Sequence, residues 1–195
     1  MGYLGSLEAV KAAGEIIDRL LAPGGVAIVD PAMADNGKLY SGFDEDYVRA
    51  IGSLAGKADI ILPNVTEAAI LSGLQYQENI DRNYVNQLLN GLNHPCAVLT
   101  GVDFDEDSTG IVLQEGTVQH EYRHKRIGTG CHGTGDIFAA VFTGALMQGK
   151  NRLDAAKIAA DFTCRCIENT VSAPAHWYGV KFEPLLPELM EMPGR

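Results

Sequence analysis

The sequence is poor in residue types that define several common protein classes. Its 195 residues include four cysteines, one tryptophan and no long apolar run. A chain of this length can bury a sizeable core, so four scattered cysteines do not predict a disulfide framework. We interpret Cys96, Cys131, Cys164 and Cys166 as reduced thiols of a cytoplasmic protein. No segment reaches membrane-spanning length and the first residues lack a secretory-signal pattern, so we expect no membrane partner.

Positive charge is also scarce. The chain has 15 lysines and arginines against 25 aspartates and glutamates, which gives a net charge of −10. A general nucleic-acid binder needs a basic face, so this balance argues against that class. If the chain binds phosphates, it must do so through local dipoles, a few cations and a metal ion. Its length and its 46% hydrophobic content favour one globular domain over residues 1–195.

Apolar runs of two kinds alternate along the chain. Short buried runs that end at proline or glycine predict strands over 26–30, 58–62 and 96–100. Helical patterns are expected over 7–21, 44–54, 67–72, 81–92, 134–147, 153–169 and 184–190. A hairpin is expected from 110–114 and 117–122, and a polar loop over 34–38. This order predicts an α/β fold with a parallel sheet covered on both faces.

Polar residues follow each predicted strand. Asp30 and Asp35 follow the first, Asn64 and Glu67 the second, and Thr100 ends the third. Ligands of open parallel sheets bind beyond the carboxyl ends of the strands, so we expect these residues at one edge. Each also has a structural interpretation. Asp30 before a proline is typical of a turn, Asn64 or a neighbouring threonine would cap a helix with Glu67 in its first turn, and Thr100 alone is a weak signal.

The most informative segment is the glycine-rich loop 128–136, which leads into an apolar helix. Glycines let backbone N–H groups approach a ligand closely, and a helix N-terminus adds partial positive charge. Together they predict a phosphate site. Asp136 lies in the first helical turn, where a base would take a proton from a hydroxyl that attacks a phosphoryl group.

Two features beside this loop have open interpretations. His132 adjoins it, although nothing there demands imidazole chemistry. The basic run from His120 to Arg126 is either a solvated hairpin edge or a flap near nucleotide phosphates.

These motifs, in this order, resemble the ribokinase-like superfamily and, within it, the pyridoxal/pyridoxamine kinases. The segment 133–136 reads Gly-Thr-Gly-Asp, as in the superfamily's anion hole and catalytic base, and Asn64-x-x-Glu67 resembles its magnesium-organising element. Gly2-Tyr3 and the stretch from Asp30 to Tyr40 resemble substrate and phosphate segments of the pyridoxal kinases. The resemblance implies a three-layer α/β/α fold with a mainly parallel sheet.

The resemblance also implies roles for individual residues. Asp136 is the expected catalytic base, with Gly133, Thr134 and Gly135 as the anion hole; Asp30, Asn64 and Thr100 contact ATP; Glu67, Asn64 and Asp35 organise Mg²⁺, mostly through water; Tyr3 and Tyr40 contact the substrate. The implied reaction is ATP-dependent phosphorylation of the 5′-hydroxymethyl group of pyridoxal, pyridoxamine or pyridoxine. Mg²⁺ is the implied cofactor, and a requirement for a monovalent cation is left open.

The chain departs from the family at its start, where it lacks the family's first strands and helices. We therefore expect residues 1–195 to be the nucleotide-binding, C-terminal portion of such a kinase, N-terminally truncated. A portion of this kind would keep a nucleotide site and phosphorylate pyridoxal poorly or not at all. Its uncovered sheet edge would favour self-association, and we therefore expect a homo-oligomer, namely a dimer.

Other functions remain open at this point. A kinase for hydroxymethylpyrimidine or another small alcohol is the nearest alternative, and a non-catalytic nucleotide-binding or oligomerisation module is a second. A dinucleotide-dependent oxidoreductase is disfavoured because its glycine fingerprint follows the first strand, whereas this loop comes late. A P-loop kinase is disfavoured because no Gly-Lys-Ser/Thr follows the glycines.

Overall fold

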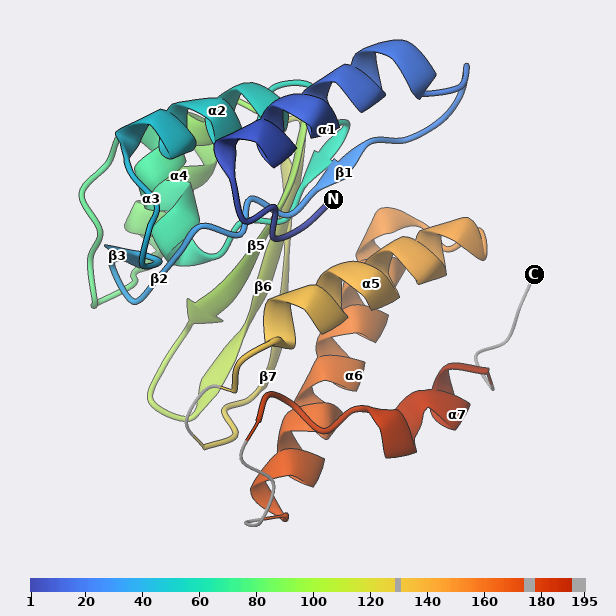
Figure 1. The fold of residues 1–195 in the computed structure, drawn as a ribbon. Coiled ribbons are helices and arrows are strands. Elements are labelled where there is room, and N and C mark those ends of the chain that lie inside the picture. Colours follow the sequence, from blue (N-terminus) through green and yellow to red (C-terminus); the bar gives the residue numbers. More distant parts are fainter. Residues whose placement is uncertain (129–130, 174–177, 191–195) are drawn as a thin grey trace.

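The computed structural model describes residues 1–128, 131–173 and 178–190 (Figure 1). Positions 129–130 of the glycine-rich loop lie outside the described residues, as do 174–177 and 191–195. All four cysteines are free, as the sequence predicts. None of the helices in the described part is long and apolar enough to cross a membrane.

The centre of the fold is a five-stranded sheet in the order β1-β4-β5-β6-β7. Its strands are β1 (Ile28–Val29), β4 (Ile60–Ile61), β5 (Cys96–Asp103), β6 (Ser108–Glu115) and β7 (Val118–Lys125). β1 and β5 both run parallel to β4, whereas β6 is antiparallel to β5 and to β7. The predicted α/β fold is therefore confirmed, with a mixed sheet. The short turn between β6 and β7 forces these neighbours to be antiparallel.

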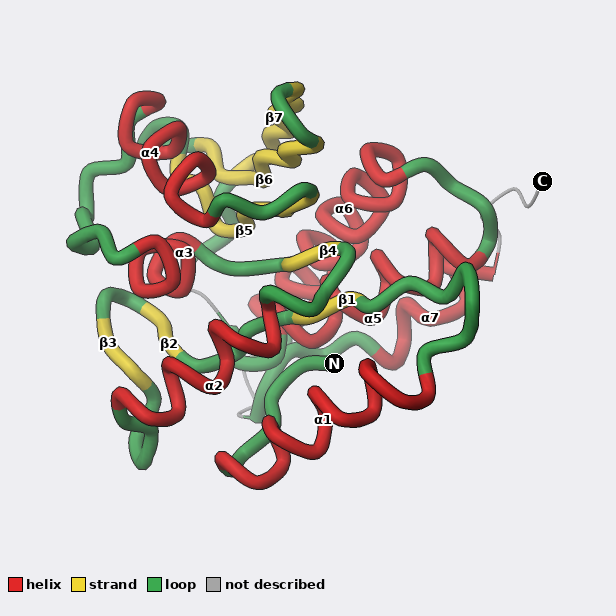
Figure 2. Tube along the Cα trace, turned by 90° about the horizontal axis from the view of Figure 1, so that it is seen from above, coloured by secondary structure: helices red, strands yellow, loops and turns green. Residues whose placement is uncertain are grey.

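Helices cover both faces of the sheet (Figure 2). One face is covered by α1 (Leu7–Leu20), α2 (Glu45–Ala55), α3 (Val65–Ser72) and α4 (Arg82–Leu92), and the other by α5 (Thr134–Met147) and α6 (Arg152–Val171). A short helix, α7 (Leu186–Met190), follows near the end. This arrangement gives the three layers that the sequence predicts.

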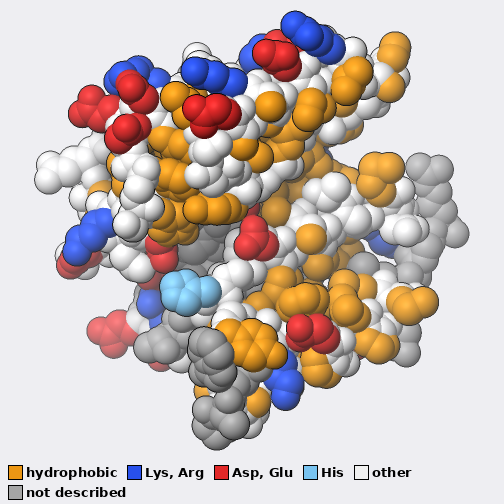
Figure 3. All heavy atoms as spheres, in the orientation of Figure 1, with side chains coloured by type: hydrophobic (Ala, Val, Ile, Leu, Met, Phe, Trp, Pro, Cys, Tyr) orange, Lys and Arg blue, Asp and Glu red, His pale blue; other side chains and the backbone are white. Residues whose placement is uncertain are grey.

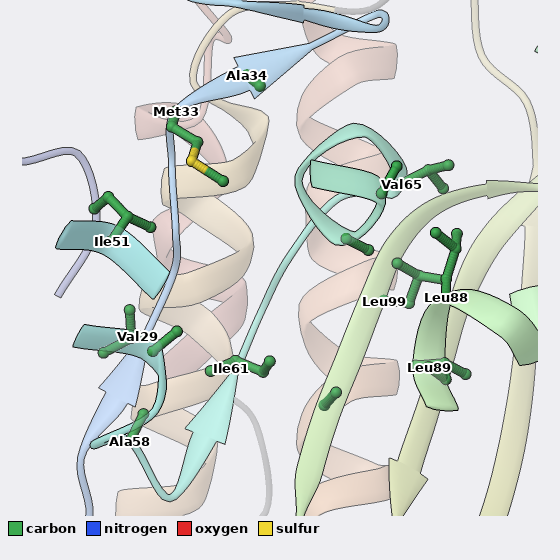
Figure 4. Close-up of a cluster of buried hydrophobic side chains, with 14 of the residues drawn as sticks. Val29, Met33, Ala34, Ile51, Ala58, Ile61, Val65, Leu88, Leu89 and Leu99 are labelled. Carbon is green, nitrogen blue, oxygen red and sulfur yellow. The ribbon is translucent and has the colours of Figure 1, made fainter. Parts of the chain in front are cut away.

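Alternating strand residues supply two hydrophobic cores. Val29 and Ile61 pack with the α1–α4 core, which Figure 4 shows in close-up, and Ile28 and Ile60 pack with the α5–α6 core. All four side chains alternate across the sheet because successive residues of a strand point to opposite faces. This alternation explains why the short apolar runs that predict strands are buried on both faces of the sheet.

The structure differs from the sequence expectations at two places near the first strand. β1 covers two residues of the five expected over 26–30. The expected polar loop over 34–38 instead contains a small hairpin of β2 (Ala34–Asp35) and β3 (Lys38–Leu39). Asn36 and Gly37 form its turn with φ of 50° and 74°. A two-residue hairpin of this kind needs positive φ at both positions, which asparagine and glycine tolerate.

The N-terminal residues lie beside the edge of the sheet. The Met1 amine donates to the Ile28 carbonyl at 2.8 Å, and the Asp30 N–H donates to the Met1 carbonyl at 2.8 Å. These two bonds hold Met1 alongside β1. They place the next residues, Gly2 and Tyr3, beyond the carboxyl end of that strand.

Candidate functional site

One cavity of about 650 Å³ contains every site residue that the sequence singles out. Its lining includes Tyr3, Asp30, Asp35, Tyr40, Asn64, Glu67, Thr100, Gly133, Thr134, Gly135 and Asp136. The cavity lies at the carboxyl ends of β1 and β4 and at the start of α5. In Figure 3, acidic and histidine side chains appear on this face of the molecule, between the layer of α1 and α2 and helix α5. The expected convergence at one sheet edge is therefore observed.

Asp30 and Asp136 bring two carboxylates together from distant parts of the chain. Asp30 follows β1 and is 8% exposed, whereas Asp136 lies in the first turn of α5 and is exposed. Burial and then the charge of Asp136 raise the pKa of Asp30 to about 7, and the Met1 amine opposes this shift. Asp30 therefore binds a proton readily near neutral pH unless a cation joins it.

The start of α5 is open to a ligand. Gly133 is the N-cap with φ of 88°, and no side chain caps the helix there. The N–H groups at 134–136 belong to the first turn, where no intrahelical acceptor exists. By contrast, a side chain caps each of α1–α4 and α6, from Ser6, Asp44, Asn64, Asp81 and Asn151 respectively. The uncapped donors, together with the helix dipole, suit a phosphate.

Asn64 and Glu67 form a capping box at the start of α3. The Asn64 side chain accepts from the Glu67 N–H at 2.9 Å, and the Glu67 carboxylate accepts from the Asn64 N–H at 2.9 Å. The helix begins at Val65 rather than at Glu67 as expected, because Asn64 is the cap. The other Glu67 oxygen accepts from the Met33 N–H at 3.0 Å, and the Asn64 amide donates to the Ala34 carbonyl at 2.8 Å.

These bonds leave Asn64 and Glu67 as a rigid, polar floor of the cavity. Glu67 is 2% exposed, and burial is the main reason why its pKa rises to about 8. Its backbone hydrogen bonds lower the pKa and the Asp30 charge raises it further. The structural interpretation of the pair as a helix cap is confirmed. Their metal-organising role stays a prediction, and their occupied polar atoms favour action through water.

Thr100 joins this floor from the neighbouring strand. Its N–H donates to the Pro63 carbonyl at 2.9 Å, and it forms an isolated parallel bridge with Asn64. β5 continues past the expected end at Thr100, and the register shifts between Thr100 and Val102, where Gly101 has φ of 66°. Thr100 and Gly101, at this irregularity, both line the cavity.

Tyr3 and Tyr40 stand at one end of the cavity and belong to a small aromatic cluster. The Phe43 ring lies 5.7 Å from that of Tyr3 and 6.4 Å from that of Tyr40, and it stacks on Tyr47 at 3.7 Å. Burial, followed by the charges of nearby carboxylates, raises the pKa of Tyr40 to about 12, so its hydroxyl stays a donor. Sequence reasoning missed Phe43, because only the tertiary fold brings it between the two tyrosines.

The opposite end of the cavity is more apolar. Ile127 beyond β7, Phe138 of α5, and Ala160 and Ile167 of α6 line it, together with the polar side chains of His124 and Thr163. Cys131 and Cys164 also reach this wall. Burial is the main reason why the pKa of Cys164 rises to about 12, so its thiol stays protonated. An apolar wall of this kind suits a flat nucleobase better than it suits phosphates.

The basic run on β7 borders the cavity through His124, Lys125 and Arg126. Arg126 forms a salt bridge of 2.7 Å with Asp103, which also lines the cavity. Arg123 lies over the Phe104 ring at 4.1 Å. Arg123, Lys125 and Arg126 are exposed on or just beyond the edge strand β7, which agrees with a solvated hairpin edge, and a role beside nucleotide phosphates stays a prediction. His132 lines the cavity as well, and its carbonyl accepts from the Val180 N–H at 3.0 Å.

Comparison with known proteins places the chain in a family. The model for the family described as phosphomethylpyrimidine kinase matches residues 1–180. The chain belongs to this family. Its ribokinase-like character, which the sequence motifs predict, is thereby confirmed.

Individual relatives agree with this assignment. The chain is 30% identical to the hydroxymethylpyrimidine/phosphomethylpyrimidine kinase of Bacillus subtilis, over 74% of this chain and 54% of that protein. The pyridoxal kinase structure from Lactobacillus plantarum matches with a TM-score of 0.84 and 30% identity, over 97% of this chain and 69% of that one. The pyridoxal kinase of Staphylococcus aureus, solved with AMP-PCP and pyridoxal, matches with a TM-score of 0.72 and 26% identity, over 86% and 60%.

These matches cover only part of each relative's length. The chain spans about half the length of the Bacillus subtilis relative. The comparisons establish the family and the fold directly. The activity and substrate of the longer relatives come to this chain only as a proposal.

Proposed function

We propose that the chain catalyses ATP-dependent phosphorylation of the hydroxymethyl group of a small aromatic alcohol, with a pyridoxal-type compound as acceptor. The observation that carries this proposal is the pairing of Asp136 with an uncapped helix start in one cavity. The carboxylate is a base, and the N–H groups are donors for a phosphoryl group. Phosphoryl transfer requires these two elements side by side.

Asp136 acts in this reaction as the base. Its carboxylate accepts the proton of the acceptor hydroxyl, and the hydroxyl oxygen then attacks the γ-phosphorus of ATP. The bond between that phosphorus and the ADP oxygen breaks, so ADP leaves as the new phosphate ester forms. The N–H groups at 134–136 hold the negative charge on the transferring oxygens. Positioning and charge stabilisation account for most of the rate.

Among the described residues, no group of three or more histidine, cysteine, aspartate or glutamate side chains could hold a metal ion, so a divalent cation beside Asp30 would need oxygens of the nucleotide or of water among its ligands. Asp30 and Glu67 are both buried, and none of the salt bridges among the described residues includes either of them. Burial is the main cause of their raised pKa values, and a bound cation would lower both. Oxygen donors of this type suit Mg²⁺, which keeps several waters. Asp30 would hold the ion, with Glu67, Asn64 and Asp35 acting through water, and the bound ion would neutralise phosphate charge.

The two ends of the cavity suggest how the substrates are oriented. The apolar wall of Ile127, Phe138, Ala160 and Ile167 suits the nucleobase of ATP, and the phosphates then reach the start of α5. Tyr3 and Tyr40 at the other end suit a flat acceptor ring. The Staphylococcus aureus relative, solved with AMP-PCP and pyridoxal, supports a site for both molecules in this fold.

A hydroxymethylpyrimidine acceptor is the second candidate. The family model and the Bacillus subtilis relative both favour it. Both acceptors are flat heteroaromatic rings with a hydroxymethyl group, so the same aromatic end of the cavity suits both. A non-catalytic nucleotide-binding module is the third candidate.

An acceptor panel tests these candidates. The purified chain is incubated with Mg²⁺ and ATP plus pyridoxal, pyridoxine, hydroxymethylpyrimidine or ribose, and ADP and the phosphorylated product are measured. We expect pyridoxal and pyridoxine to give product above the background without acceptor. A higher kcat/KM for hydroxymethylpyrimidine would support the second candidate. ATP binding with no product from any acceptor would contradict the proposed activity and support the third.

A further inference from the structure

Gly2 lies against both carboxylates of the proposed reaction centre. A Cβ atom built on Gly2 would lie 3.6 Å from Asp136 Oδ1 and 3.6 Å from Asp30 Oδ2. No other described atom outside its chain neighbours comes within 4 Å of that position. The missing side chain therefore leaves a small free volume whose far wall is made of two carboxylate oxygens.

The N-terminal segment fixes Gly2 in this place. Met1 is bonded to Ile28 and Asp30, and Tyr3 packs against Phe43. Gly2 lies between these two anchored residues and against Asp136, which lines the cavity together with Tyr3. A hydroxyl that gives its proton to Asp136 must come within about 3 Å of a carboxylate oxygen. The free volume in front of Gly2 borders that approach.

We propose that Gly2 determines which acceptors reach Asp136, because its missing side chain keeps open the volume that an acceptor hydroxymethyl group enters. This inference rests on the proposed phosphoryl transfer and adds a residue that limits the size of the acceptor. Water, which is smaller than a hydroxymethyl group, needs less of this volume. A side chain at position 2 is thus expected to reduce transfer to an alcohol more than transfer to water.

The fold itself tolerates a side chain at this position. Gly2 is not among the residues with positive φ, so an L side chain meets no backbone strain there. A methyl group would make ordinary van der Waals contacts at 3.6 Å rather than a clash. Gly144 offers a matched control, because it lies on the exposed face of α5 and a Cβ there meets nothing within 4 Å.

The experiment compares the wild type with Gly2→Ala, Gly2→Val and Gly144→Ala. For each protein we measure kcat/KM for pyridoxal, the rate of ATP hydrolysis without acceptor, and the Kd for AMP-PCP. Pyridoxal binding in the presence of AMP-PCP is followed by its absorbance, which gives a readout independent of turnover. Thermal unfolding verifies that all four proteins are folded.

We expect Gly2→Ala to lower kcat/KM for pyridoxal by at least roughly tenfold, since small displacements of a reacting group have effects of this size or larger. Gly2→Val should lower it further, whereas ATP hydrolysis and the Kd for AMP-PCP should change little. Gly144→Ala should match the wild type.

Failure of this inference can be distinguished from failure of the proposed function. A Gly2→Ala variant with wild-type kcat/KM for pyridoxal would overturn the inference alone. If the wild type binds pyridoxal without phosphorylating it, the proposed activity fails, and unchanged pyridoxal affinity in Gly2→Ala then overturns the inference as well. A wild type that neither binds nor phosphorylates any acceptor overturns both.

Discussion

Three of the carboxylates in the cavity have different surroundings. These surroundings suggest a different role for each. Asp136 is exposed at the start of α5, where a substrate can reach it. Asp30 is buried close to it, and its pKa rises to about 7. Glu67 is buried and bonded to two backbone N–H groups. The same functional group, a carboxylate, thus supplies a proposed base, a candidate cation ligand and a structural support.

The raised pKa of Asp30 predicts how stability depends on pH without metal. Its folded pKa of about 7 lies above the ordinary value of 3.8, so the protonated form is favoured by folding. That stabilisation is complete below pH 4 and is lost as the pH rises through 7. Glu67 acts in the same direction, because its pKa is also raised. The metal-free chain should therefore lose stability between pH 5 and pH 8.

Urea unfolding in EDTA at pH 5 and pH 8 measures this effect. The free energy of unfolding should fall by roughly 1 to 3 kcal/mol in the wild type, given about 1.4 kcal/mol for each pKa unit and some relaxation of the site. Asp30→Asn should show a smaller fall because the titrating group is gone. Equal falls in the two proteins would show that Asp30 does not carry the dependence.

At the scale of elements, two helices that begin at the cavity differ in how their N-termini are capped. α3 begins with a complete capping box, in which the Asn64 side chain accepts from the Glu67 N–H and the Glu67 side chain accepts from the Asn64 N–H. α5 begins at Gly133 without a side-chain cap, so its first donors remain for a ligand. The capped helix holds the floor of the cavity in place. The uncapped helix leaves its first N–H groups for the proposed phosphate.

This contrast predicts a larger role for the Asn64 cap than for a cap elsewhere. Asn64→Ala removes the bond to the Glu67 N–H and the bond to the Ala34 carbonyl. Asp81→Ala removes only the cap of α4, a bond of 2.7 Å to the Tyr84 N–H, outside the cavity lining. We expect a loss of about 1 kcal/mol for Asp81→Ala and about 2 kcal/mol for Asn64→Ala in urea unfolding.

Nucleotide binding separates the two variants further. The Kd for AMP-PCP should rise in Asn64→Ala and stay at the wild-type value in Asp81→Ala, because only the first disturbs the cavity floor. Equal losses of stability with unchanged nucleotide affinity in both variants would mean that the Asn64 cap is an ordinary helix cap.

At the scale of the whole molecule, the sequence predicts the layers and the convergence of the site well. Buried runs that end at Asp30, Asn64 and Thr100 are short-range signals, and the rule for parallel strands then brings their ends together. The hairpin β2–β3 was missed because each strand has only two residues, too few for a period to appear. Phe43 carries no signal in the sequence, and Gly2 belongs to a segment that resembles a substrate motif, but its contacts with Asp30 and Asp136 arise only from tertiary packing.

The central claim is that this cavity performs phosphoryl transfer with Asp136 as the base. The most direct measurement compares turnover of the acceptor in the wild type, Asp136→Asn and Asp154→Asn, with Mg²⁺ and ATP. Asp154 is a matched control, because it also lies in the first turn of a helix but outside the cavity lining.

We predict that Asp136→Asn lowers kcat by roughly 10²- to 10⁴-fold, the usual contribution of a positioned base, with a nearly unchanged Kd for ATP. Asp154→Asn should turn over the acceptor at the wild-type rate. Wild-type kcat in Asp136→Asn would contradict the account.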